Sequence, residues 1–158
     1  MGKSALDHSF ASIDGGTLNL STWAGKPMLV VNTASRCGFT SQYSGMQALY
    51  DRFRERGLIV LAVPSDDFRQ ELDSAEAVKA FCEVNFDLDL PMADITKVTG
   101  RQAHPFYKWV ATEAGFRPRW NFNKVLIGRD GQIAATFGAT AGPQSRRVIK
   151  AVEAALGG

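Results

Sequence analysis

The chain has few of the residues on which metal sites and disulfide frameworks depend. It contains only two cysteines and two histidines among 158 residues. Two cysteines do not make a disulfide framework, and this set supplies a zinc site poorly. The cysteines, Cys37 and Cys82, are not a C-x-x-C pair, which argues against a dithiol oxidoreductase of the usual kind. We therefore expect no metal and no bound cofactor.

An excess of charge of one sign is also absent. The 18 basic and 16 acidic residues give a net charge of +2, too balanced to indicate nucleic acid or an anionic membrane as a partner. No apolar stretch approaches the length of a transmembrane helix. Residues 1–8 lack the apolar core of a signal peptide, so we expect a cytoplasmic protein. A mature periplasmic chain with a new initiator methionine would look the same.

The composition is that of an ordinary globular protein. Hydrophobic residues make up 45% and charged residues 22% of the chain, and 158 residues suit one domain with a sizeable core. The sequence shows no repeats, low-complexity tracts or linker-like stretches. We therefore expect residues 1–158 to form a single domain.

The first half of the chain predicts a hairpin followed by a βαβ unit. Apolar residues alternate around Asp14-Gly15-Gly16 between residues 10 and 20, as in a β-hairpin. Residues 28–32 and 58–63 are apolar runs typical of buried strands. An amphipathic helix between them runs to about Arg56. The two strands should therefore be parallel and central in the sheet.

The second half predicts helices and a second hairpin. Asp73 and Glu76 form a capping box for a helix that reaches about residue 86, and residues 104–109 form a short helix. Residues 124–127 and 133–137 flank a hairpin turn, and Pro143 opens a final helix. The pattern predicts an α/β fold in which helices flank a mixed central β-sheet behind an N-terminal β-hairpin, the thioredoxin-like arrangement.

Cys37 follows the first buried strand and precedes the amphipathic helix. Backbone N–H groups and the helix dipole favour negative charge at such a position, and thiols at helix N-termini can have a lowered pKa. The thiolate is a good nucleophile at neutral pH. The alternative is that Cys37 is a small buried residue that fills space.

Four ordered blocks then carry a family resemblance. Residues 32–43 around Cys37, the His-Pro-aromatic run at 104–109, the Trp-Asn-Phe run at 120–124 and the turn at 129–131 resemble the corresponding segments of the glutathione peroxidase family. The resemblance covers nearly the whole chain, from about Phe10 to Leu156.

This resemblance implies a chemistry for Cys37. As the peroxidatic residue, in place of the selenocysteine of some relatives, Cys37 would attack a hydroperoxide and become a sulfenic acid. Trp120 and Asn121 would direct indole and amide N–H groups toward its sulfur. Without the resemblance, Trp120 would read as a core aromatic and Asn121 as a turn residue.

Asp67 departs from the family pattern. It stands where the family has a glutamine that is the third donor to the peroxidatic residue. An ionised carboxylate cannot donate a hydrogen bond and repels a thiolate. Either Asp67 is protonated, or it accepts a proton from peroxide or water, or it points away from the site. In the last case Gln70 is a candidate substitute.

Cys82 matches the resolving cysteine of the thioredoxin-dependent members. Such a residue attacks the sulfenic acid and forms an internal disulfide, here Cys37–Cys82, which thioredoxin or glutathione then reduces. Disulfide geometry would require the helix that carries Cys82 to unwind locally. The alternative is a core role, since Cys82 shares a helix face with Val78 and Phe81. The short segment from Trp109 to Trp120 resembles the monomeric branch, which often prefers thioredoxin.

The leading hypothesis is therefore a thiol peroxidase, an enzyme that reduces hydrogen peroxide or organic hydroperoxides. A peroxide sensor that passes its disulfide to a partner protein would use the same two cysteines. A thioredoxin-fold binding module that has lost catalysis is the third alternative.

Overall fold

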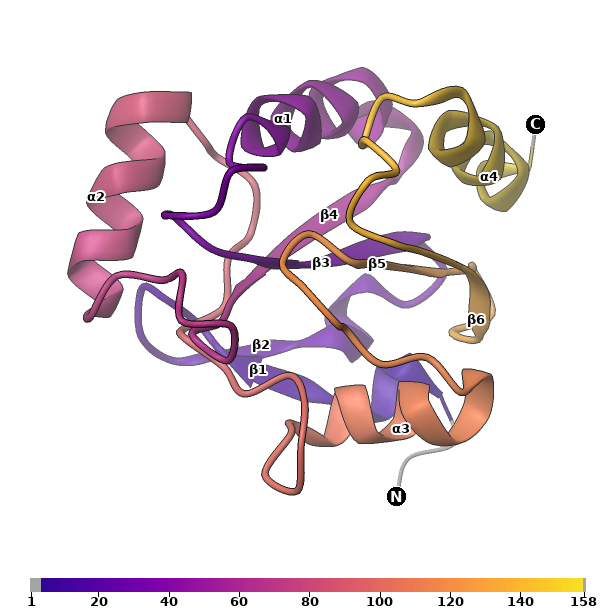
Figure 1. Cartoon of the computed structure of the whole chain (residues 1–158). Coiled ribbons are helices and arrows are strands. Elements are labelled where there is room, and N and C mark those ends of the chain that lie inside the picture. Colours follow the sequence, from indigo (N-terminus) through magenta and orange to yellow (C-terminus); the bar gives the residue numbers. More distant parts are fainter. Residues whose placement is uncertain (1–3, 158) are drawn as a thin grey trace.

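A four-stranded mixed sheet lies at the centre of the computed structural model, which describes residues 4–157 (Figure 1). Residues 1–3, part of the segment considered above for a signal peptide, lie outside the described residues. The strand order is β4-β3-β5-β6, with β3 parallel to β4 and antiparallel to β5. The predicted βαβ unit is thus confirmed. The strands are β3 (Met28–Thr33), β4 (Ile59–Pro64), β5 (Lys124–Ile127) and β6 (Ile133–Phe137).

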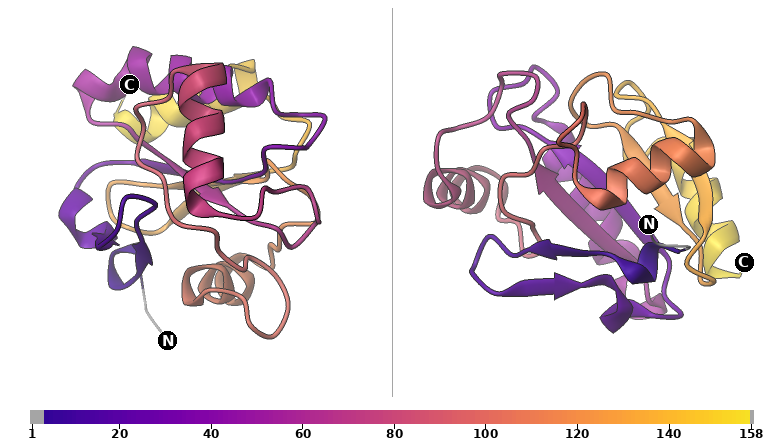
Figure 2. Two further views of the ribbon diagram at one scale, coloured as in Figure 1. Left: turned by 90° about the vertical axis from the view of Figure 1, so that its left-hand side faces the viewer. Right: turned by 90° about the horizontal axis from the view of Figure 1, so that it is seen from below.

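Helices cover both faces of this sheet, as predicted for the α/β, thioredoxin-like arrangement. Helices α1 and α4 lie on one face, and α3 with the β1–β2 hairpin lies on the other, while α2 stands at one end (Figures 1 and 2). No helix in the described part of the chain has the length and apolar character to cross a membrane. The bounds are β1 (Ser9–Ala11), β2 (Thr17–Asn19), α1 (Gln42–Phe53), α2 (Ala75–Phe86), α3 (Pro105–Ala114) and α4 (Arg146–Leu156); 3-10 helices span Ala5–Asp7, Leu20–Trp23 and Arg54–Arg56.

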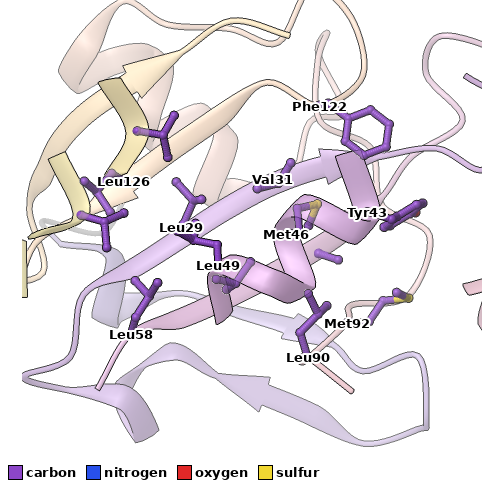
Figure 3. Close-up of a cluster of buried hydrophobic side chains, with 14 of the residues drawn as sticks. Leu29, Val31, Tyr43, Met46, Leu49, Leu58, Leu90, Met92, Phe122 and Leu126 are labelled. Atoms are coloured by element: carbon purple, nitrogen blue, oxygen red, sulfur yellow. The ribbon is translucent and has the colours of Figure 1, made fainter. Parts of the chain in front are cut away.

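Strand β3 divides the hydrophobic core into two clusters. Its alternate residues point to opposite faces, so Leu29 and Val31 pack beneath α1, whereas Met28 and Val30 pack toward α3. Figure 3 shows the α1 side of this core. All six residues of β3 are buried, as expected of a strand covered on both faces.

The structure corrects three details of the sequence prediction. Strand β4 lies at the edge of the four-stranded sheet and is not central; the segment at Met92 covers it through an isolated parallel bridge to Ala62. Helix α2 is capped by Ser74, whose hydroxyl accepts from the backbone N–H of Ala77 at 3.1 Å. Helix α4 begins at Arg146 behind a Ser145 cap. Pro143 therefore lies in the preceding turn and does not open the helix.

A lysine is buried in the sheet. The Lys124 side chain on β5 is fully buried, and its Nζ donates to the carbonyl of Phe122 at 2.6 Å. Burial lowers the pKa of Lys124 to about 8, because the charged form loses its hydration. Unfolding restores the ordinary, higher value. Between these two values the unfolded chain binds more protons, so stability from this group rises with pH.

We expect this linkage to appear when the wild type is compared with Lys124→Met, which cannot titrate. The free energy of unfolding of the wild type, relative to the variant, should rise above about pH 8 with a slope of at most about 1.4 kcal/mol per pH unit. Urea unfolding of both proteins at several pH values measures this difference in the free energy of unfolding. A difference that stays flat over this range would mean that Lys124 keeps its ordinary pKa in the folded state.

Candidate active site

Three segments meet at the carboxyl end of β3. Parallel strands end at the same edge of a sheet, so the segments that follow β3 and β4 emerge side by side. Strand β5 runs the other way, and the segment that leads into it reaches the same edge. These segments are residues 34–41, 65–73 and 119–123, and they carry all the predicted site residues except Cys82.

Cys37 lies in a turn between β3 and α1. Its side chain is 3% exposed, and its Sγ accepts from the backbone N–H of Phe39 at 3.4 Å. The predicted strand-to-helix position is confirmed, but α1 begins only at Gln42. The hydrogen bond to the sulfur therefore comes from a backbone N–H of the turn and not from the first turn of the helix. A backbone N–H is a donor that changes of side-chain protonation do not remove.

The segments that follow β3 and β4 are fastened to each other just before Cys37. The N–H of Ser35 donates to Oε1 of Glu71 at 3.0 Å, and the N–H of Arg36 donates to the carbonyl of Gln70 at 2.7 Å. Oε1 of Glu71 also accepts from the N–H of Leu72 at 2.8 Å. The backbone that leads into Cys37 is thus fixed by two hydrogen bonds that it donates to a neighbouring loop.

Glu71 is a residue of this site that the sequence pattern does not indicate. The side chain is 4% exposed, and Oε2 has no hydrogen-bond partner among the described residues. Burial raises the pKa of Glu71, and the hydrogen bonds from Ser35 and Leu72 offset part of this rise. No sequence signal distinguishes it from an exposed acidic loop residue, because its burial depends on contact with the loop after β3.

Asn32 holds the third segment in place. The side-chain Nδ2 of Asn32 donates to the backbone carbonyl of Trp120 at 2.9 Å. The backbone carbonyl of Asn32 accepts from the N–H of Phe122 at 2.5 Å. Nδ2 of Asn123 donates to the same Trp120 carbonyl at 2.7 Å. The backbone of the Trp-Asn-Phe run is therefore fixed on both sides of Asn121.

Trp120 and Asn121 differ sharply in exposure. The Trp120 side chain is 38% exposed, and its ring lies 5.6 Å from that of Phe68. Asn121 is fully buried, yet neither Oδ1 nor Nδ2 has a partner in the described part of the chain. Leaving a buried amide unpaired costs about 1–3 kcal/mol. A buried polar group of this kind needs an explanation. A ligand or a thiolate that accepts a hydrogen bond from the Asn121 amide would explain it.

Asp67 points to a different part of the molecule. Its Oδ2 accepts from the backbone N–H groups of Val98 at 2.6 Å and Thr99 at 3.0 Å, so it stabilises the turn that precedes α3. The Gln70 side chain donates to the neighbouring carbonyl of Arg69 at 3.4 Å. The backbone carbonyl of Gln70, and not its side chain, contacts the loop before Cys37.

Cys82 is buried on the inner face of α2. It is 1% exposed, belongs to the same hydrophobic cluster as Cys37, and both thiols are free. Burial raises the pKa of the Cys82 thiol to about 11, and the carboxylates of Glu71 and Glu83 raise it while Tyr43 lowers it. At neutral pH the Cys82 side chain is therefore protonated. Nowhere in residues 4–157 do three or more His, Cys, Asp or Glu side chains gather as metal ligands.

Comparison with known proteins decides the family. The sequence model of the family described as glutathione peroxidase matches residues 5–111. The chain belongs to the glutathione peroxidase family. A relative from Synechocystis, named hydroperoxy fatty acid reductase Gpx2, is 39% identical, and the match covers 96% of this chain and 99% of the relative.

Solved structures agree with this membership. The crystal structure of GPX1 from T. cruzi superposes with a TM-score of 0.78 at 30% identity, over 99% of this chain and 98% of that one. A thioredoxin-family thiol:disulfide interchange protein from Chlorobium tepidum gives a TM-score of 0.70 at 18% identity, over 95% and 93% of the two chains. The second likeness shows that the glutathione peroxidase fold here is thioredoxin-like. As a member of this family, the protein is a thiol peroxidase that reduces hydroperoxides with electrons from a thiol reductant.

The contacts of Asp67 predict the result of Asp67→Asn. An amide oxygen still accepts from one of the two N–H groups, but a neutral acceptor binds them more weakly, so we expect a loss of about 1 kcal/mol of stability. The rate at which peroxide oxidises Cys37 should equal that of the wild type. Urea unfolding and stopped-flow oxidation measure the two quantities. A changed oxidation rate with unchanged stability would show that Asp67 acts on Cys37.

Proposed function

We propose that Cys37 is the nucleophile of this peroxidase and that Cys82 resolves its oxidised form. The observation that carries the first assignment is the surroundings of the Cys37 turn. A backbone N–H points at the sulfur. The buried amide of Asn121, which has no hydrogen-bond partner among residues 4–157, lies at the same end of β3. The residue next to Asn121 in the chain, Trp120, supplies an indole N–H and a partly exposed ring.

The first proposed step oxidises Cys37. The Cys37 thiolate attacks the terminal oxygen of a hydroperoxide; the S–O bond forms, and the O–O bond breaks. The sulfur is oxidised to a sulfenic acid, and the departing oxygen takes a proton to leave as an alcohol or as water. Donors at Trp120 and Asn121 stabilise negative charge on the sulfur and on the departing oxygen.

In the second step the Cys82 thiol attacks the sulfenic sulfur. The S–S bond forms, the S–O bond breaks, and the hydroxyl leaves as water with the proton of Cys82. A disulfide requires the two Cα atoms to come within about 7 Å. Since Cys82 is buried on a helix and protonated, α2 must open locally before it reacts.

The packing of α2 supports such an opening. Only Val78 and Cys82 are fully buried on this helix, and Val84 is 84% exposed. Segments with few buried apolar contacts open at low free-energy cost. Helix α2 also stands at the end of the sheet and not over a face (Figure 2).

A dithiol protein such as thioredoxin would then reduce the disulfide and restore both thiols. The presence of Cys82 favours thioredoxin over glutathione as the reductant, because an internal disulfide is its usual substrate. A peroxide sensor that passes the disulfide to a partner protein would use the same two residues. Rapid peroxide turnover with thioredoxin separates the two functions. The monomeric state and the cytoplasmic location stay predictions.

Replacement of the nucleophile tests the first assignment. Cys37→Ser should abolish peroxide consumption, because a hydroxyl is un-ionised at neutral pH and is a poor nucleophile. The assay follows peroxide loss with thioredoxin and its reductase. Peroxide consumption by the variant at the wild-type rate would make the assignment wrong.

Replacement of the second cysteine is the matched control. Cys82→Ser should keep the first oxidation but stop steady turnover with thioredoxin. Its intact mass after peroxide should show added oxygen, whereas the wild type should lose two hydrogen atoms as the disulfide forms. Wild-type protein that gains oxygen and forms no disulfide would leave Cys82 with a core role only.

A further inference from the structure

Phe122 has a backbone conformation that is unusual for its residue type. Its φ is +62°, in the left-handed region, where a bulky residue other than glycine is strained. The residue is fully buried, and its ring meets that of Tyr43 edge-on at 5.3 Å (Figure 3). Strain of this kind persists only where the surroundings hold the backbone in place. Because Phe122 directly follows Asn121, its conformation fixes the direction in which the chain leaves Asn121.

The peptide groups on both sides of Phe122 are held by hydrogen bonds. On the N-terminal side, the N–H of Phe122 donates to the backbone carbonyl of Asn32 at 2.5 Å. On the C-terminal side, the carbonyl of Phe122 accepts from Nζ of Lys124 at 2.6 Å. These two contacts together hold the backbone of Phe122 in its strained conformation. Only the second comes from a side chain, so a substitution can remove it alone.

Lys124 also contacts a third segment. Its Nζ donates to the carbonyl of Ala139, between β6 and α4, in a long contact of 3.5 Å. The same carbonyl accepts from Nε2 of Gln42 at 2.7 Å, and Gln42 is the first residue of α1. The ammonium group therefore connects the run that carries Asn121 with the helix that follows the Cys37 turn.

The burial of a charged side chain at this place needs a reason beyond packing. Lys124 is fully buried, and it forms no ion pair with any residue between 4 and 157. A buried charge without a partner is costly, and an apolar side chain of similar volume fills the same space without that cost. An apolar side chain cannot, however, donate a hydrogen bond to the carbonyl of Phe122.

We propose that Lys124 is a positioning residue of the peroxidase, which holds Phe122 in its strained conformation and so directs the amide of Asn121 toward the reacting atoms at Cys37. This inference rests on the proposed function, in which Asn121 is a donor to the sulfur and to the departing oxygen. Lys124 itself touches none of the reacting atoms. Without the lysine, Phe122 relaxes toward negative φ, and the amide of Asn121 is displaced.

The test compares two reactions of Cys37 in the reduced protein at pH 7. Both need the thiolate, but only oxidation by hydrogen peroxide has a departing oxygen for the Asn121 donor, and alkylation by iodoacetamide has none. Stopped flow and peptide mass spectrometry give the two rate constants. In Lys124→Met the ratio of the oxidation rate to the alkylation rate should fall about tenfold, as expected for a displaced catalytic group. In Asn121→Ala the ratio should fall at least as far.

The double variant Lys124→Met/Asn121→Ala decides whether Lys124 acts through Asn121. Its ratio should equal that of Asn121→Ala alone, because the lysine cannot position an amide that is absent. If Lys124→Met lowered the ratio by the same factor with and without Asn121, the two residues would act independently and the proposal would be wrong. A wild-type ratio in Lys124→Met would also overturn it.

The matched control is Val125→Ala, which changes the next residue of β5. The side chain of Val125 is buried in the core cluster on the α3 side of the sheet, since successive strand residues face opposite sides. This variant should lose stability and keep the wild-type ratio. A ratio that falls as far in Val125→Ala as in Lys124→Met would assign the effect to a general loss of packing and overturn the proposal.

Lys124→Leu repeats the test with a second apolar side chain and should match Lys124→Met. Urea unfolding shows whether each variant is folded. Loss of the folded state in both Lys124 variants would make Lys124 a residue of the fold alone and overturn the proposal. Equal ratios in Asn121→Ala and in the wild type would instead contradict the proposed donor role of Asn121, on which this inference rests.

Discussion

Strand β3 is hydrogen-bonded on both sides, to β4 in parallel and to β5 in antiparallel orientation. This double pairing brings together the end of one parallel strand, the end of its neighbour and the start of a strand that runs the other way. Asn32, near the end of β3, extends the pairing with its side chain and so fixes the Trp-Asn-Phe run. The position of every proposed catalytic group, other than Cys82, follows from this arrangement.

Sequence patterns predicted the elements well where the pattern is local. The apolar runs gave β3 and β4, and Asp14-Gly15-Gly16 gave the hairpin, because periodicity and turn chemistry act within a few residues. Boundaries were less accurate, since neighbouring residues compete for the same role: Ser74 caps α2 although Asp73 precedes it. The edge position of β4 depends on the order of strands far apart in the chain, which periodicity does not encode.

The site was predicted in part, and the reason lies in distance along the chain. Cys37 carries its own signal, as it follows a buried strand. Glu71 and Asp67 carry no such signal, because each accepts a hydrogen bond from a backbone N–H of a distant segment. Glu71 accepts from Ser35, and Asp67 accepts from Val98. The buried Lys124 likewise looks like any strand lysine until the fold surrounds it. Charged residues of this kind are assigned only once the three-dimensional contacts are known.

Helix α2 links the proposed mechanism to redox thermodynamics. In the proposed cycle the helix is intact while Cys82 is a thiol and is partly unfolded in the disulfide form. Every contact that stabilises α2 therefore stabilises the reduced protein alone and makes the disulfide a stronger oxidant. About 1.4 kcal/mol of helix stability raises the two-electron reduction potential by about 30 mV. In that proposed cycle, the Ser74 cap and the burial of Val78 would set how readily a reductant reduces the disulfide, although neither residue reacts.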